Sequence, residues 1–289
     1  MLLLETLSAN PTFLVGFVFV VGLLVGSFLN VVIFRFPKML EQNWKAEARE
    51  VLELPEEPTD TVTLSRPAST CPHCGHAIRW YENVPVLSWL WLRGKCSACG
   101  KGISFRYPAI ELTSAILAAT CAVHFGYGPW LAVTLLATWM LVAMAMIDFD
   151  TTLLPDNLTL PLMWLALFAA LIGISPLSVE QAVTGAMAGY LSLWSVYWLF
   201  KLVTGKEGMG YGDFKLLAAL GALLGWKMLP LVLLLSSVVG AVVGISLITT
   251  GAIKRQQGIP FGPYLATAGW ISLLWGDTIV TAYLGLFKF

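Results

Sequence analysis

The sequence predicts an all-α polytopic membrane protein with about eight transmembrane helices and one soluble insertion between helices one and two. Hydrophobic residues make up 57% of the chain, charged residues 12%, and the mean hydropathy is +0.78. Such a composition is too apolar for a soluble domain of 289 residues. Ten of the 17 Lys and Arg residues and four of the five cysteines lie between the first and second long apolar stretches. The insertion is therefore expected outside the lipid.

Eight apolar stretches account for the predicted spans. A spanning helix needs about 20 apolar residues, and we predict one helix for each of the ranges 13–34, 109–126, 129–147, 158–174, 181–203, 214–227, 229–250 and 262–286. The sixth range is short, so either its Gly-rich lead-in completes the span or the helix enters from a water-filled notch. The first ten residues contain no Lys or Arg, and we expect no cleavable signal peptide.

Three segments follow from this pattern. Residues 1–34 form the first transmembrane helix, 35–107 a cytoplasmic insertion, and 108–289 a seven-helix block. Within the insertion, Glu41 to Leu54 has apolar residues at helical spacing and predicts an amphipathic helix. This helix either lies on the membrane surface, packs on the zinc module or is a solvated linker.

The distribution of basic residues predicts the orientation. Lys and Arg concentrate at 35–106, at 201–215 and at 254–255, whereas the turns at 126–129 and 175–180 contain none. By the positive-inside tendency, the three basic segments are cytoplasmic and both termini lie outside. Asp148 and Asp213, 65 positions apart, then emerge on the same cytoplasmic face.

Four cysteines predict a metal site. Cys71, Cys74, Cys96 and Cys99 form two CxxC pairs separated by 21 residues, a spacing typical of tetrahedral four-thiolate zinc. Two disulfides are the alternative, but disulfides are rare on the reducing side of a membrane. A closed four-Cys site leaves no open position for a substrate, so the zinc is expected to be structural. His73 and His76 are alternative ligands, and Cys121 is interpreted as a small hydrophobic residue.

Two carboxylates at the ends of apolar runs suggest catalysis. Ionisable residues at a membrane boundary are costly and indicate function. Two carboxylates that share one proton can activate water and protonate a leaving amine, so Asp148 and Asp213 predict an intramembrane aspartyl protease. Gly210 and Gly212 permit close backbone approach. Asp213 is alternatively an N-cap of the next helix, while Asp150 and Asp156 compete for the first catalytic role, with Asp156 also read as an N-cap.

The sequence closely resembles the type IV prepilin leader peptidases over nearly its whole length. The resemblance rests on Gly26 to Val32, the double CxxC, Tyr107-Pro108 with Glu111, Ile147-Asp148 followed by Leu154-Pro155-Asp156, Gly210 to Asp213, and Pro260 to Pro263. It implies a bifunctional enzyme of the bacterial inner membrane that cleaves prepilins and secretion pseudopilins and then N-methylates the new terminus. It also implies that Asp148 is the first catalytic residue, with Asp156 shaping the site.

Methyl transfer is less visible in the sequence. No Gly-rich loop of the dinucleotide-binding kind is present, so S-adenosylmethionine binding is implied by the resemblance alone. We expect the donor or acceptor site between the two cysteine pairs, at Glu82 and Gly94, where Trp80 and Tyr81 stack on adenine or meet the sulfonium. Alternatively, these two aromatic residues anchor the insertion at the membrane interface.

Other classes of function fit the sequence less well. A proton-coupled transporter usually has charges nearer the bilayer midplane and repeated halves, neither of which is found. A zinc-bearing assembly scaffold has no need of the Asp pair. The expected partners are prepilin and pseudopilin substrates and the lipid bilayer, without nucleic acid. The substrate's basic leader is expected to meet Asp150, Asp156 and Glu207, and the sequence leaves the oligomeric state open.

Overall fold

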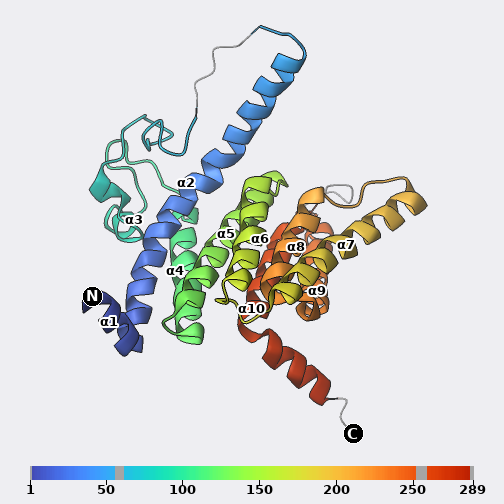
Figure 1. Ribbon diagram of the computed structural model, residues 1–289. Coiled ribbons are helices and arrows are strands. Elements are labelled where there is room, and N and C mark those ends of the chain that lie inside the picture. Colours follow the sequence, from blue (N-terminus) through green and yellow to red (C-terminus); the bar gives the residue numbers. More distant parts are fainter. Residues whose placement is uncertain (1, 56–61, 252–258, 287–289) are drawn as a thin grey trace. The chain divides into compact units, whose positions relative to one another are not determined.

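The computed structural model describes residues 2–55, 62–251 and 259–286, and this part of the chain is helical apart from turns and two isolated β-bridges. Figure 1 labels the principal helices. The elements are α1 (Leu2–Ala9), α2 (Pro11–Val51), η1 (Trp80–Asn83), α3 (Leu87–Trp91), α4 (Arg106–Phe125), α5 (Pro129–Thr151), α6 (Asp156–Leu171), α7 (Val179–Thr204), α8 (Tyr211–Leu224), η2 (Trp226–Met228), α9 (Leu229–Thr249) and α10 (Gly262–Gly285).

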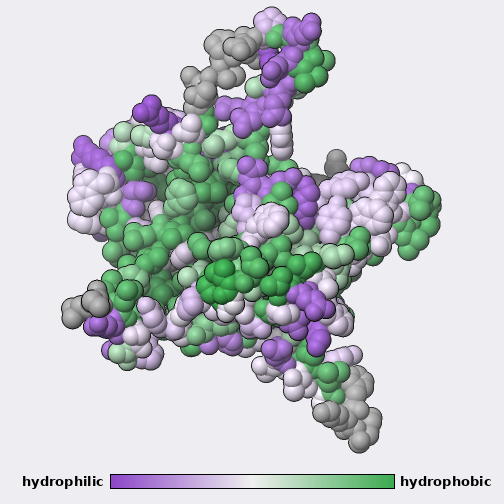
Figure 2. Space-filling model, viewed as in Figure 1, coloured by the Kyte–Doolittle hydropathy of each residue, from purple (hydrophilic) through white to green (hydrophobic). Residues whose placement is uncertain are grey.

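Five of the described helical segments are long and apolar enough to cross a membrane. They are α2, α4, α5, α7 and the continuous stretch Trp226–Thr249, while α6 is a shorter apolar helix. Many of their large apolar side chains are exposed, as expected for surfaces that face lipid, and Figure 2 shows apolar residues covering much of the visible surface. The chain is therefore a multi-pass membrane protein. Each of the eight predicted stretches overlaps a described helix, but three of these helices, α6, α8 and α10, do not meet the criteria of length and composition.

The first predicted span is part of a longer helix. The apolar range 13–34 and residues 41–51 of the predicted amphipathic helix belong to α2, which continues through Pro37 for 41 residues. At 1.5 Å per residue its length is about 60 Å, twice the hydrocarbon thickness of a bilayer. Figure 1 shows α2 running beside α4 and then extending past it. A short helix, α1, precedes it and was not predicted.

The chain divides into two compact units, Met1–Tyr127 and Gly128–Phe289. In the first unit, α2 packs on α4 through Gly22 and Gly26. A Cβ atom on Gly22 would lie 2.6 Å from Cα of Ala115, and one on Gly26 would lie 2.6 Å from Cα of Glu111. Small residues four positions apart thus let the two membrane helices meet backbone to backbone. The three predicted segments, 1–34, 35–107 and 108–289, remain a prediction.

In the second unit, α8 is the central helix. Ten of its 14 residues are buried, and it contacts α6, α7, α9 and α10. Gly185 and Gly189 of α7 lie against the backbone of α8 at Gly221 and Leu217, where no side chain would fit. This close packing fixes α8, and with it Asp213 in its first turn. The basic residues Lys254 and Arg255, used above for orientation, lie outside the described residues.

Candidate active site and metal centre

Asp148 lies in the last turn of α5 and is buried, with 4% of its surface exposed. Its neighbour Asp150 is exposed. The helix ends at Thr152, whose left-handed backbone (φ 53°) places its N–H on the carbonyl of Asp148. A carboxylate at a helix C-terminus is unfavourably placed with respect to the helix dipole. Another group must therefore stabilise the negative charge of Asp148.

That group is the first turn of α10. The N–H of Gly262 donates a 2.9 Å hydrogen bond to Oδ2 of Asp148, so the carboxylate faces the N-terminus of α10. A Cβ atom at position 262 would lie 2.7 Å from Oδ2 of Asp148. The absence of a side chain is thus a requirement of this contact. Gly262 lies in the motif Pro260 to Pro263, but its role was not predicted, although a glycine between Phe261 and Pro263 was the available signal.

Asp213 lies in the first turn of α8 and is also buried, with 7% of its surface exposed. The helix begins at Tyr211 with Gly210 as its N-cap residue, so Asp213 is the third helical residue. The alternative interpretation of Asp213 as the N-cap is therefore wrong. The carboxyl groups of Asp148 and Asp213 interact electrostatically. Two buried carboxyl groups from different helices thus belong to one polar site.

The glycines before Asp213 have different roles. A Cβ atom on Gly212 would lie 2.6 Å from Cβ of Leu154, because the first turn of α8 lies against the segment between α5 and α6. A Cβ atom on Gly210 would lie 3.9 Å from Oδ2 of Asp213, an ordinary contact. Gly212 therefore brings the two Asp-bearing segments together, whereas Gly210 borders the carboxylate.

Two of the acidic residues expected near the substrate leader already have basic partners. Lys215 of α8 contacts both oxygens of Asp156 at 2.7 Å, and Lys201 lies 2.8 Å from Oε1 of Glu207. Asp156 is the first residue of α6, after the N-cap residue Pro155, so its predicted N-cap role is wrong. The ion pair instead links the starts of α6 and α8, close in sequence to Leu154 and Gly212, which also contact each other.

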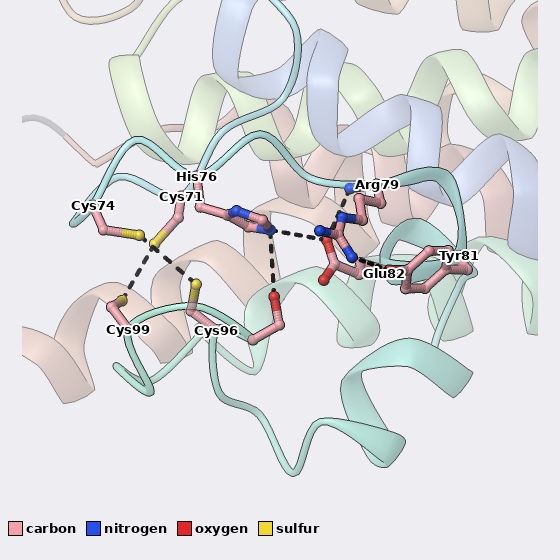
Figure 3. Close-up of polar contacts among 9 residues, drawn as sticks. Cys71, Cys74, His76, Arg79, Tyr81, Glu82, Cys96 and Cys99 are labelled. Carbon is pink, nitrogen blue, oxygen red and sulfur yellow. Dashed lines mark hydrogen bonds and ion pairs between the residues drawn. The ribbon is translucent and has the colours of Figure 1, made fainter.

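The four predicted cysteine ligands meet in one cluster, and Figure 3 shows their sulfurs pointing toward one another. All four sulfurs lie within 4.8 Å of each other, with Cys71–Cys99 at 3.9 Å and Cys74–Cys96 at 4.0 Å. Four thiolates around zinc at 2.3 Å have sulfurs about 3.8 Å apart. The cluster therefore fits a tetrahedral metal. All five cysteines are free thiols, which contradicts the disulfide alternative.

The two cysteine pairs have the same backbone conformation. Cys71 N–H bonds to the carbonyl of His76 and Cys96 N–H to that of Lys101, while Gly75 and Gly100 take positive φ angles of 72° and 69°. The N–H groups of His73 and Cys74 lower the pKa of Cys71 to about 6. Those of Cys99 and Ala98 lower the pKa of Cys96. Each turn thus favours the thiolate form of its first cysteine, whereas burial and hydrogen bonding to the neighbouring thiols raise the pKa of Cys74 to about 11.

Glu82 is joined to the cysteine cluster through His76 (Figure 3). Its Oε2 accepts the N–H of Arg79 at 2.8 Å and lies 3.3 Å from Nε2 of His76, which is 3.4 Å from the hydroxyl of Ser97. Its side chain is only 9% exposed. The Ser97 hydroxyl, the Arg79 N–H and His76 lower the pKa of Glu82 to about 2. Glu82 is an anion that holds the segment between the cysteine pairs against the second pair.

Gly94 lies at a tight turn just before the second cysteine pair. Its φ is +65°, and a Cβ atom would lie 2.8 Å from the ring of Trp89. The Trp89 indole N–H donates a hydrogen bond to the carbonyl of Ile103, and this bond holds the ring over Gly94. Gly94 thus has a structural reason to be glycine.

Comparisons with known proteins place the chain in a family. Residues 20–125 match the bacterial peptidase A24 N-terminal domain, and residues 135–245 match the type IV leader peptidase family. The chain is 57% identical to a prepilin leader peptidase/N-methyltransferase of Stutzerimonas stutzeri over 97% of both chains. Proteins of that name from Pseudomonas aeruginosa and Aeromonas hydrophila are 56% and 55% identical, over 97–98% of each chain. No solved structure matches the chain.

Proposed function

Since this chain belongs to the type IV leader peptidase family, we propose that Asp148 and Asp213 form its peptidase centre. The chain is a bifunctional prepilin leader peptidase and N-methyltransferase. Its substrate as a peptidase is a prepilin, and we extend this to the pseudopilins of type II secretion. The leader of such a substrate is cut off first, and the newly exposed N-terminal amine is then methylated.

The burial of two interacting carboxyl groups carries the assignment of the peptidase centre. Two carboxyl groups in a partly dry site share one proton more easily than they both ionise. The ionised carboxylate takes a proton from water as the oxygen attacks the scissile carbonyl. The other carboxyl group donates its proton to the leaving amine when the C–N bond breaks. Both proton transfers are thus supplied by one pair.

The division of labour between Asp148 and Asp213 is supported by their neighbours. The Gly262 N–H and the N-terminus of α10 stabilise a negative charge on Asp148. Asp148 therefore begins the cycle ionised and acts as the base. The negative charge of Asp148 disfavours ionisation of Asp213. Asp213 therefore carries the shared proton and acts as the acid.

The position of the site in the cell follows from topology. The chain is a multi-pass protein, and we place it in the bacterial inner membrane with eight spans, α6, α8 and α10 completing the five long ones. Lys and Arg concentrate at 35–106, the segment that contains the four cysteines, and at 201–215, the segment that contains Asp213. By the positive-inside tendency, we place both segments in the cytoplasm.

The metal and the methyl donor are assigned to the first unit. The sulfur spacing and the lowered pKa of Cys71 support zinc, which when bound closes the insertion around its four thiolates. The methyl donor is S-adenosylmethionine, and Glu82 and Gly94 mark the part of the insertion where transfer takes place. The lowered pKa of Glu82 supports this, because an ionised carboxylate attracts the terminal ammonium or the sulfonium.

The test is incubation of the purified full-length protein with a prepilin and S-adenosylmethionine, followed by mass spectrometry. The peptidase predicts loss of the leader, and the methyltransferase predicts a gain of one methyl group on the shortened product. A transporter or a zinc-bearing scaffold leaves the prepilin intact. Intact prepilin from a folded, zinc-loaded protein would refute the proposed peptidase centre.

A further inference from the structure

The insertion carries an unpartnered apolar surface, and we propose that it docks on the lipid of the membrane that α2 and α4 cross. The surface comprises Leu87, Leu90 and Trp91 of α3, which are 64%, 58% and 87% exposed. Side chains of this size are rarely left together in water without a partner. The depth at which α3 is held favours lipid as the partner.

Helix α3 has an apolar face that points away from the rest of the insertion. Leu87, Leu90 and Trp91 are spaced i, i+3 and i+4, so they share one face of the helix, and that face is the exposed one. Trp89 points the other way, covers Gly94 and contacts Phe105 ring to ring at 5.7 Å. The rest of the cysteine module is thus packed on one side of α3, and the exposed apolar face lies on the other. Such an arrangement is typical of interfacial helices.

The depth is fixed by a buried carboxylate in α4. Oε2 of Glu111 accepts the N–H of Val86, the residue before α3, at 2.7 Å. Glu111 is 8% exposed and lies five residues inside the membrane helix that begins at Arg106, which is about 7.5 Å along its axis. The start of α3 is therefore held beside the first turns of a membrane span and not out in the cytoplasm.

Helix α2 gives an independent mark for the edge of the bilayer. Glu111 packs on Gly26, and the amide of Asn30 donates to the carbonyl of Tyr107 at 3.2 Å, so these residues of α2 and α4 lie at matching levels. No charged residue occurs in α2 before Arg35, five residues beyond Asn30. Glu111, beside Gly26, therefore lies deeper in the apolar part of the helix pair than Arg35. Since Glu111 binds the residue before α3, α3 lies at the boundary between hydrocarbon and headgroups.

The residues around the surface agree with this boundary. Trp and Tyr side chains concentrate at membrane interfaces, where the ring lies among the headgroups. Arg93 and Lys95 follow α3 directly and are exposed, as expected beside the phosphates of a bilayer. The backbone of Val86 has a φ of +61°, an unusual value for a β-branched residue. The contact with Glu111 is therefore maintained against local strain.

The test places the photoreactive residue p-benzoylphenylalanine, one position at a time, at Leu87, Leu90 and Trp91 of the full-length protein in vesicles of phosphatidylethanolamine and phosphatidylglycerol. His73 and Lys101, exposed on the cysteine pairs, are the matched controls. After illumination, mass spectrometry is expected to find lipid adducts at least fivefold more abundant at the three α3 positions. Equal yields at all five positions, or crosslinks from α3 to protein instead of lipid, would overturn the proposal.

A second pair of variants tests the role of Glu111. Glu111→Gln keeps an oxygen that accepts the Val86 N–H, whereas Glu111→Ala removes it. With the photoreactive residue at position 91, the lipid adduct is expected to fall severalfold in Glu111→Ala and to stay near its original yield in Glu111→Gln. Hydrogen exchange of residues 84–92 is expected to quicken in the Ala variant only. Unchanged exchange and adduct yield in Glu111→Ala would show that Glu111 does not position α3.

Discussion

The N–H of Gly262 donates a hydrogen bond to the carboxylate of Asp148 across 114 positions of sequence. This bond joins the C-terminus of one helix to the N-terminus of another, and it orients a carboxylate that would otherwise face an unfavourable dipole. The proposed acid–base pair therefore depends on a residue that has no side chain. The first two predictions follow from this arrangement.

Removing either carboxyl group is expected to abolish cleavage. Asp148→Asn and Asp213→Asn each retain the shape of the side chain but cannot share a proton, so the rate of prepilin cleavage should fall by at least 1000-fold, about 4 kcal/mol of transition-state stabilisation. Asp150→Asn is the matched control because Asp150 is exposed two residues away, and it should stay active. Cleavage by Asp148→Asn at a near wild-type rate would refute the pair.

Adding one methyl group at Gly262 is expected to impair cleavage. The new Cβ atom of Gly262→Ala would lie 2.7 Å from Oδ2 of Asp148, so the carboxylate must move. We expect kcat to fall by at least tenfold, about 1.4 kcal/mol, with KM nearly unchanged. Gly285→Ala, in the same helix with nothing within 4 Å of the new atom, is the control. Equal kcat values for the two variants would contradict this role of Gly262.

Loss of one cysteine ligand is expected to release the metal. Replacing any of Cys71, Cys74, Cys96 or Cys99 by Ser should lower the zinc content measured by atomic spectrometry and destabilise the insertion, because metal binding there is coupled to folding. Methylation should suffer at least as much as cleavage. Cys121→Ala, remote from the cluster in sequence and buried in α4, should keep its zinc. Intact protein with free thiols and no zinc would contradict the metal assignment.

The two activities are expected to be separable. Glu82→Gln and Gly94→Ala alter the insertion without touching Asp148 or Asp213, so methylation should fall while cleavage continues. The new amine has an unperturbed pKa of about 7.7–8.0 and needs little help to lose its proton, so the loss should come from positioning. Mass spectrometry of the processed pilin gives both yields. Fully methylated product from both variants would place the transferase site elsewhere.

The anionic state of Glu82 predicts a pH dependence of stability. Its pKa of about 2 lies below the value of 4.5 for a free side chain, so its stabilising contacts are complete above pH 4.5 and are lost as the pH falls toward 2. The urea midpoint of the wild type should exceed that of Glu82→Gln at pH 7. The difference should shrink below pH 4.5. A difference that persists unchanged at pH 3 would show that the charge of Glu82 is not responsible.

Local sequence patterns predicted much of this molecule because lipid imposes strong constraints. A bilayer leaves helices as the spanning elements of such an apolar chain, so the eight apolar ranges predicted helices with small errors at their ends. The two CxxC pairs likewise predicted four sulfurs in one cluster, and the structure confirms it. The apolar range that ends at residue 34 is only part of its helix, because α2 continues through Pro37. A change from apolar to charged residues marks the end of the lipid and not the end of a helix.

The sequence by itself determined the membrane class, the helices, the cysteine cluster and the two candidate carboxylates, because each depends on residues close together or on composition. Only the tertiary structure decided which groups meet these residues: Gly262 on Asp148, Leu154 on Gly212, Lys215 on Asp156 and Val86 on Glu111. Each contact joins separate segments, and three of them use backbone atoms or the absence of a side chain. A backbone N–H is present at nearly every residue, so its presence alone does not identify the one that binds.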